Sequence, residues 1–225
     1  MSVPDLPLPP APAEARGAFG DGFDLAQRYA ELLAGPGVER GLIGPREAPR
    51  LWERHLLNCA GLAALIPDGA TVVDLGSGAG LPGLVLALVR PDCHITLVEP
   101  LLRRTTFLDE VVDDLALSNV DVVRSRAEEL HGRQVFDVVT ARALAPLDRL
   151  LGWAMPLVGP GGELLAMKGS SAAEEIAAAG PVLKRLGCGD PHQVSVSGTT
   201  VVRVPQGPSA QRRGPGRSGS KKKGK

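Results

Sequence analysis

The chain has 225 residues, of which 44% are hydrophobic and 3% aromatic, a composition that fits one α/β domain with an aliphatic core. No apolar run approaches the roughly 20 residues that a membrane-spanning helix needs, and residues 1–12 lack the basic-then-apolar order of a signal peptide, so we expect a cytoplasmic protein without membrane contact. The formal net charge is zero, yet seven of the 25 basic residues and none of the 25 acidic ones lie in residues 206–225, which leaves residues 1–205 with a net charge of −7.

The cysteines and histidines give no sign of a metal site. Cys59, Cys93 and Cys188 are far apart, form no C-x-x-C pair, and have none of the four histidines clustered with them. Structural metal sites are built from ligands at short, regular spacings. We therefore expect reduced thiols and no metal.

The N-terminal third of the chain divides into two expected parts. Residues 1–20 are rich in proline and are expected to form a disordered leader. Residues 21–70 are expected to form a helical extension, because apolar residues recur twice at steps of three and four. The first pattern covers residues 23–33 and should stop at the Gly-Pro-Gly segment that follows it; the second covers residues 52–66.

Short β-branched runs alternate with amphipathic segments over residues 71–205, the region expected to form the main domain. Such alternation predicts an α/β fold with a mostly parallel, Rossmann-like sheet and helices on both faces. The seven expected strands are residues 71–75, 94–99, 120–123, 136–140, 163–167, 194–196 and 200–204, the last two as an antiparallel pair. The expected helices are one beginning near residue 81 and residues 101–117, 146–155 and 172–186.

The basic tail over residues 206–225 is rich in Gly, Ser and Pro and is expected to be disordered. Its charge suits contact with phosphates, which would give salt-sensitive and sequence-independent attraction to RNA. A solubilising terminus without a function explains the same composition. Both interpretations stay open.

A glycine-rich loop follows the first strand of the main domain. Asp74 is followed by Gly76, Gly78 and Gly80 at the point where the strand gives way to a helix. Glycines at this point allow positive φ and let a ligand approach the backbone, and α/β sheets bind ligands at the carboxyl ends of their strands. A ligand-binding loop is therefore favoured over an ordinary glycine-rich turn.

Two cofactors compete for this loop. Residues 78–83 match the G-x-G-x-x-G pattern of dinucleotide binding, and Glu99 lies where a ribose-binding acid belongs, which would make the protein an NAD(P)-dependent oxidoreductase. Pro82, however, removes a backbone donor that a pyrophosphate would use, and Asp74 suits a cation better than a diphosphate. S-Adenosylmethionine (SAM) carries a sulfonium, an ammonium and a carboxylate but no phosphate. The loop therefore favours SAM, with the dinucleotide as the alternative.

Two further segments are candidates for the rest of the cofactor site. Glu99, at the end of the second expected strand, can accept both ribose hydroxyls through its carboxylate. The loop that contains Ala127, Glu128 and Glu129 follows the third strand and should pass the edge of the adenine. A backbone N–H and a carboxylate can read that edge, and the position favours Glu128 over Glu129. An exposed, capping pair of glutamates is the alternative.

Several motifs occur together in the order of a known family. They are G-x-G-x-G-L-P-G over residues 76–83, S-R-x-E-E over residues 125–129, the segments around Arg142 and Lys168, and the Arg54 and His55 pair. Over residues 51–204 the chain resembles the bacterial 16S ribosomal RNA guanine-N7 methyltransferase family, RsmG or GidB. One segment departs from it, since residues 40–43 read R-G-L-I where the family often has an aromatic-Asn-Leu sequence.

The resemblance implies a class I SAM-dependent methyltransferase fold with a helical N-terminal extension, and methylation of the N7 of one guanine in 16S ribosomal RNA. Its implied partner is the small ribosomal subunit or an assembly intermediate. We expect the protein itself to be a monomer. The cofactor positions that it implies are Gly76, Leu81, Ala127, Glu128 and Arg142, with Glu99 as the ribose acid, and the loop pattern adds Asp74 and Gly78.

Guanine N7 carries an in-plane lone pair and no proton, so we expect no general base. Arg142 is expected to orient the cofactor carboxylate or guanine O6, with an ion pair to Asp148 as the alternative. Lys168 is a candidate phosphate contact, with an exposed strand-end lysine as the alternative. Arg54 and His55 are candidate RNA contacts, although the position of His55 at the edge of the apolar helix face slightly favours packing for that residue. A non-catalytic RNA-binding protein that has kept the fold is the remaining alternative function.

Overall fold

Seven strands form one sheet in the order β3-β2-β1-β4-β5-β7-β6 in the computed structural model, which describes residues 8–208. Strands β1 to β5 are parallel, and β7 runs antiparallel to both β5 and β6. The strands are β1 (Thr71–Leu75), β2 (His94–Val98), β3 (Val120–Val123), β4 (Phe136–Arg142), β5 (Val158–Lys168), β6 (His192–Val196) and β7 (Thr199–Pro205). This confirms the predicted mostly parallel, seven-stranded sheet with a terminal antiparallel pair.

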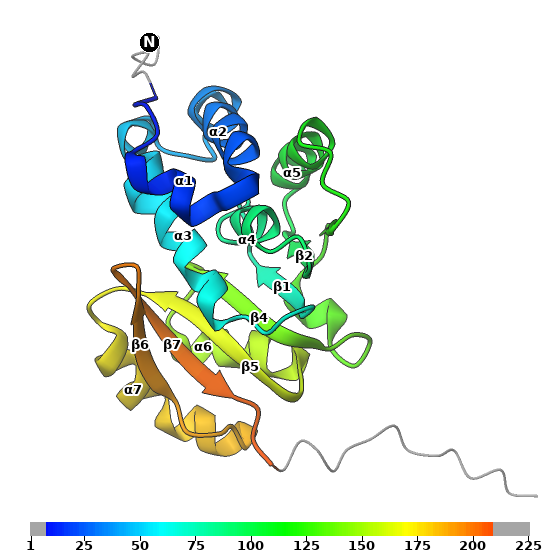
Figure 1. Cartoon of the computed structure of the whole chain (residues 1–225). Helices are drawn as coiled ribbons and strands as arrows, with labels where there is room; N and C mark the ends of the chain where they lie inside the picture. Colours follow the sequence, from blue (N-terminus) through cyan, green and yellow to red (C-terminus); the bar gives the residue numbers. More distant parts are fainter. Residues whose placement is uncertain (1–7, 209–225) are drawn as a thin grey trace, which may run out of the picture.

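Helices cover both faces of the sheet, as predicted (Figure 1). One face carries the N-terminal helices together with α4 (Gly83–Val89) and α5 (Leu102–Asp114), and the other carries α6 (Leu147–Ala154) and α7 (Ala172–Leu186). Successive strand residues point to opposite faces. Val72 accordingly packs in the core under α4, whereas its neighbour Val73 packs in the core with α6. Parallel strands that are covered on both faces need apolar side chains on both sides, which accounts for the many Val, Leu and Ala residues of the two cores.

The N-terminal extension is helical but begins earlier than predicted. The expectation of a leader without structure to residue 20 is wrong over α1 (Ala13–Phe19), and residues 1–7 lie outside the described residues. Phe19 is buried, and its ring meets that of Trp52 edge-on with 6.2 Å between the centroids. An aromatic pair of this kind supplies enough apolar contact to order a short helix that proline-rich neighbours would not favour.

The two helical patterns predicted over residues 21–70 are present, with non-α turns inside them. After α2 (Phe23–Leu32), the Gly-Pro-Gly segment does not stop the helix, because it continues as a π-helical turn (Leu33–Gly37). A wider turn accommodates a proline that has no N–H to donate. The second pattern is a π-helical turn (Leu51–Leu57), then α3 (Asn58–Gly61) and a 3₁₀ turn (Leu62–Leu65).

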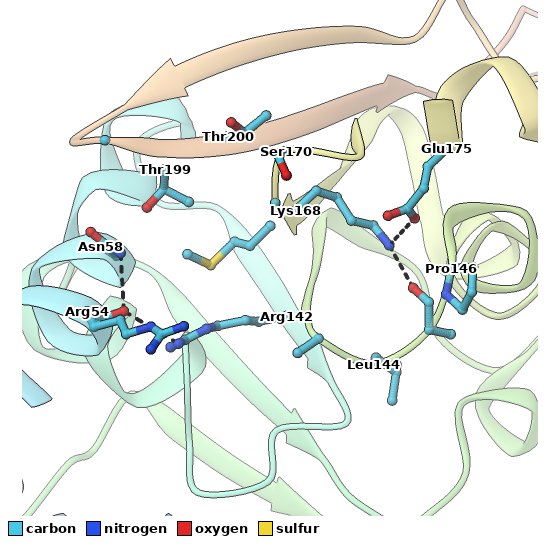
Figure 2. Close-up of a pocket in the computed structure, with 15 residues that line it drawn as sticks. Arg54, Asn58, Arg142, Leu144, Pro146, Lys168, Ser170, Glu175, Thr199 and Thr200 are labelled. Carbon is cyan, nitrogen blue, oxygen red and sulfur yellow. Dashed lines mark hydrogen bonds and ion pairs between the residues drawn. The ribbon is translucent and has the colours of Figure 1, made fainter. Parts of the chain in front are cut away.

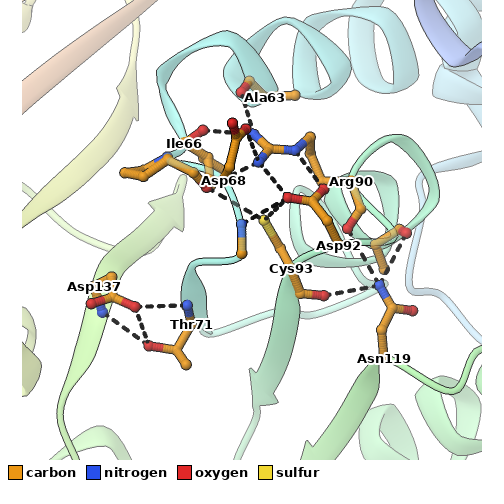
Figure 3. A network of polar contacts seen from close by, with 12 residues as sticks. Ala63, Ile66, Asp68, Thr71, Arg90, Asp92, Cys93, Asn119 and Asp137 are labelled. Carbon is orange, nitrogen blue, oxygen red and sulfur yellow. Dashed lines mark hydrogen bonds and ion pairs between the residues drawn. The ribbon is translucent and has the colours of Figure 1, made fainter.

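A polar network fastens this extension to the sheet at the amino ends of β1 and β2 (Figure 3). The Arg90 guanidinium donates to the backbone carbonyls of Ala63, Ile66 and Pro67 and to the carboxylate of Asp92. These carbonyls end the last turn of the extension, where backbone carbonyls lose their intrahelical partners, and the guanidinium adds donors to them. The opposite, carboxyl ends of the strands are thereby left to form the site.

Candidate active site

The glycine-rich loop lies at the carboxyl end of β1, as predicted. Gly76 and Gly80 have φ values of 67° and 98°, a backbone region that favours glycine. A Cβ on Gly76 would lie 2.5 Å from a methyl group of Leu144. The loop backbone is therefore open to close approach only while residue 76 has no side chain.

Asp74 lies beneath this loop and is fully buried. One carboxylate oxygen accepts the N–H of Gly83 at 3.0 Å, while the other has no hydrogen-bond partner in residues 8–208. Burial raises the pKa of Asp74 to about 7, although the Gly83 N–H opposes the shift. The loop thus covers a carboxylate with one oxygen still available.

Glu99 follows β2 and reaches across to the same loop. Its carboxylate accepts the N–H groups of Gly78 and Leu101, both at 3.1 Å, and lies 3.2 Å from a guanidinium nitrogen of Arg104. Only 1% of its surface is exposed. The clamp on Gly78 was not predicted from the sequence. The predicted contact of Glu99 with a ribose stays a prediction.

The two glutamates after β3 take different positions. Glu129 accepts a hydrogen bond from the Ser125 hydroxyl at 2.7 Å and one from the Arg126 N–H at 3.4 Å, so it caps the turn. Glu128 instead lines a cavity of about 190 Å³ that is also bordered by Gly76, Val98, Pro100, Ala127, Leu144 and Trp153. The capping alternative therefore describes Glu129, and the cavity adjoins Glu128, the glutamate that the sequence favours.

A larger cleft of about 940 Å³ adjoins this cavity, and Leu144 lines both (Figure 2). Arg54 and Asn58 border it on the side of the N-terminal extension. The other side is formed by the ends of β4 and β5, the loops after them and the start of β7. Its residues include Arg142, Lys168, Ser170, Thr199 and Thr200. The sequence analysis did not single out Asn58, Thr199 or Thr200, because neither their residue types nor their spacing marks a site.

Arg142 lies at the end of β4 and is held by the N-terminal extension. Its guanidinium donates to Nδ1 of His55, to Sγ of Cys59 at 3.4 Å and to the backbone carbonyl of Arg54 at 3.5 Å. The other ring nitrogen of His55, Nε2, lies 2.9 Å from a carboxylate oxygen of Glu47. Burial and the charge of Arg142 lower the pKa of His55. The alternative ion pair between Arg142 and Asp148 is not formed in the described part of the chain.

The three candidate RNA contacts are placed differently from one another. The Arg54 side chain is 56% exposed at the cleft. Lys168 is only 9% exposed, and its ammonium donates to the backbone carbonyl of Ala145 at 2.6 Å and pairs with Glu175 at 2.7 Å. Both ring nitrogens of His55 are engaged. In this arrangement Lys168 and His55 hold neighbouring groups instead of presenting free donors to a phosphate. Arg54 pairs with Glu47 at 3.4 Å but keeps most of its guanidinium donors exposed at the cleft.

Comparison with known proteins decides the family. The family model described as rRNA small subunit methyltransferase G (GidB) matches residues 23–197. The chain belongs to the GidB family. The match includes the glycine loop and all of the cleft lining except residues 198–200, and it leaves α1 outside.

Close relatives of this GidB chain are named ribosomal RNA small subunit methyltransferase G. One from Nocardioides sp. is 64% identical over 203 residues, covering 87% of this chain and 81% of the relative. One from Streptomyces avermitilis is 59% identical over 209 residues, covering 90% of this chain and 88% of the relative. The family is an enzyme family of methyltransferases, so the chain is assigned to enzymes and not to non-catalytic binding modules.

Solved structures share the fold of this GidB chain. A Thermus thermophilus 16S rRNA methyltransferase (RsmC), in complex with AdoMet and guanosine, superposes with a TM-score of 0.54 at 18% identity, covering 68% of this chain and 43% of that one. A SAM-dependent O-methyltransferase from Thermotoga maritima gives a TM-score of 0.52 at 11% identity, covering 66% and 64%. These likenesses confirm the class I methyltransferase fold.

The described residues contain neither a membrane span nor a metal site. Between residues 8 and 208, no helix combines the length and the apolar character of a membrane span. Within the same residues, no three His, Cys, Asp or Glu side chains gather as a metal site.

Proposed function

We propose that this chain is a SAM-dependent methyltransferase that transfers a methyl group to the N7 of a guanine in 16S ribosomal RNA. The observation that carries the proposal is the family match over residues 23–197, which includes the glycine loop and Arg142. The partner is the small ribosomal subunit or one of its assembly intermediates, the enzyme acts as a monomer, and it works in the cytoplasm.

The residues around the glycine loop fit SAM. Asp74 offers a buried carboxylate oxygen that has no partner within residues 8–208, Glu99 lies buried behind the Gly78 N–H, and Glu128 lines the adjoining cavity. Carboxylates placed around the loop suit the positive charges of SAM and oppose a pyrophosphate. This charge pattern disfavours the NAD(P)-dependent oxidoreductase. The cavity of about 190 Å³ between Ala127 and Trp153 is the proposed place for the adenine.

The larger cleft is the proposed place for the guanine. Bound SAM supplies an electrophilic methyl group, and the chain has to hold the base edge-on beside it. Because N7 has a lone pair and no proton, no residue is assigned to move a proton. Holding both reactants in line can supply up to about 7–11 kcal/mol. Arg142, which lines the larger cleft, supplies N–H donors for guanine O6 or the methyl donor's carboxylate.

The experiment is transfer of labelled methyl groups from SAM to small ribosomal subunits that lack the modification, beside the same RNA free of protein. We expect one methyl group per 16S ribosomal RNA, recovered as 7-methylguanosine. Failure of transfer to either form of the RNA, with SAM bound, would refute the proposal. Comparison of the two substrates also shows whether the enzyme needs the assembled particle.

A further inference from the structure

Three side chains from distant parts of the sequence form a line beside the cleft. Glu47 comes from the 3₁₀ turn (Pro45–Arg50), His55 from the following π-helical turn and Arg142 from the end of β4. The Glu47 carboxylate lies 2.9 Å from His55 Nε2, and the Arg142 guanidinium contacts His55 Nδ1. The ring is buried, while the Glu47 side chain is 31% exposed.

The two contacts fix the tautomer of His55. A carboxylate only accepts hydrogen bonds and a guanidinium only donates them. Nε2 therefore carries the proton, and Nδ1 presents its lone pair to Arg142. A protonated ring would place an N–H of His55 against an N–H of Arg142. The charged groups that face His55 are Glu47, Arg54 and Arg142, and burial together with Arg142 lowers its pKa, so the neutral ring is the form at neutral pH.

The contacts also determine which N–H donors of Arg142 are left for a ligand. Its two terminal nitrogens are directed to His55, Cys59 and the carbonyl of Arg54, whereas its Nε–H makes no hydrogen bond within residues 8–208. An arginine that meets guanine freely donates to O6 and N7 together. Such a pair of bonds would cover the lone pair that has to attack the methyl group.

We infer that Glu47 and His55 are positioning residues that hold the Arg142 guanidinium so that it reaches guanine O6 or the methyl donor without covering N7. This inference deepens the proposed function and rests on it. Glu47 reaches Arg142 through His55, and its second oxygen also pairs with Arg54 at 3.4 Å, a contact that Glu47→Gln can keep through its amide oxygen. His55 acts through Arg142. Neither touches the reacting atoms.

The kinetic test compares Glu47→Ala with a matched control. Asp121→Ala removes the carboxylate from a second histidine pair, His94 and Asp121, which has the same 2.9 Å separation but lies at the amino end of β2, far from the cleft. We expect Glu47→Ala to lower kcat by about 10- to 100-fold, since small misplacement of a reacting geometry has that effect. The KM for SAM should change less than about threefold, and Asp121→Ala should match the wild type.

Rescue separates positioning from folding. In Glu47→Gln the amide oxygen still accepts the Nε2 proton, so kcat should return to within about threefold of the wild type. Equal kcat in wild type and Glu47→Ala would overturn the inference. So would a Glu47→Gln variant as impaired as Glu47→Ala, or a loss confined to KM.

A second readout does not depend on methyl transfer. The ¹⁵N chemical shifts of the His55 ring, assigned by comparison with His55→Leu, should report a neutral ring with the proton on Nε2 at pH 7. A proton on Nδ1, or a charged ring, would overturn the inference whether or not RNA is methylated. The expected tautomer in a protein that methylates no RNA would instead count against the proposed function alone.

Discussion

At the scale of single residues, Asp74 is a buried carboxyl group whose protonation state is linked to ligand binding. The side chain is fully buried, one oxygen has no partner within residues 8–208, and burial raises the pKa to about 7. The carboxyl is therefore largely protonated below pH 7 in the free protein. A cationic ligand favours the ionised form, so binding and deprotonation are coupled.

We expect SAM to bind more weakly as the pH falls below about 7, because the carboxyl of Asp74 must then lose its proton for the ligand to bind. Calorimetry in buffers of different ionisation enthalpy should detect proton release near pH 7. Asp74→Asn should abolish the release and weaken binding, with Asp121→Ala as the control. An affinity that is constant from pH 5.5 to 8.5 would contradict this role.

The same shift predicts the pH dependence of stability. The carboxyl titrates near pH 4 in the unfolded chain and near 7 in the folded one, so the folded state holds more protons between these values. Stability that Asp74 contributes is therefore present below about pH 4 and lost as the pH rises through 7. Thermal unfolding should show that, as the pH rises from 5 to 8, the melting temperature of the wild type falls relative to that of Asp74→Asn. A difference that stays constant, or shrinks, would be inconsistent with a raised pKa.

At the scale of elements, the loop after β4 is held by the element that follows β5. Lys168 donates to the carbonyl of Ala145, and Glu175 accepts from both Lys168 and the N–H of Leu147, at 2.7 and 2.8 Å. The loop needs such a hold, because Ala143 has a φ of 52°, which is costly for a residue with a side chain. The hold keeps Leu144 between the two cavities.

We expect Lys168→Met to lower the free energy of unfolding by about 1–3 kcal/mol, since it leaves Glu175 without its charged partner. Urea unfolding of Lys168→Met, Glu175→Gln and the double variant measures the coupling. The two changes should not be additive, because they break one network. Additive effects would mean that the pair does not hold the loop.

The first helix carries a second prediction at this scale. Phe19 is buried against Trp52, so Phe19→Ala should cost about 3–5 kcal/mol of unfolding free energy. Leu25→Ala is a suitable control, because Leu25 is 38% exposed and its truncation should have little effect. Urea unfolding of both variants gives the comparison. Equal stability of the two would show that α1 is not part of the cooperative core.

At the scale of the whole molecule, the sequence predicted the sheet well. The strands β1 and β3 and the helix α7 have the predicted bounds, because β-branched runs and helical periodicity are local properties. The glycine loop was found for the same reason, since its spacing is contained in a few adjacent residues. The predicted basic tail begins at residue 206, and from residue 209 onward it lies outside the described residues.

Contacts across the fold were not predictable from one sequence. Arg142 and His55 are separated by 87 positions, and only the packing of the extension against β4 brings them together. Glu47 belongs to no motif, and Lys168, at the end of β5, is paired with Glu175 of helix α7. The RNA contacts of His55 and Lys168 stay predictions, and the protein groups that hold these two side chains could not be read from local sequence.

The central claim is methyl transfer to guanine N7 in the small-subunit RNA. The most direct measurement is the number and position of methyl groups that the purified chain transfers from labelled SAM to unmodified small subunits, with Arg142→Ala in parallel. The account predicts one methyl group per 16S ribosomal RNA, at the N7 of a single guanine, and a strongly reduced rate in the variant. Stable SAM binding without transfer, or transfer to another atom or to several bases, would contradict it.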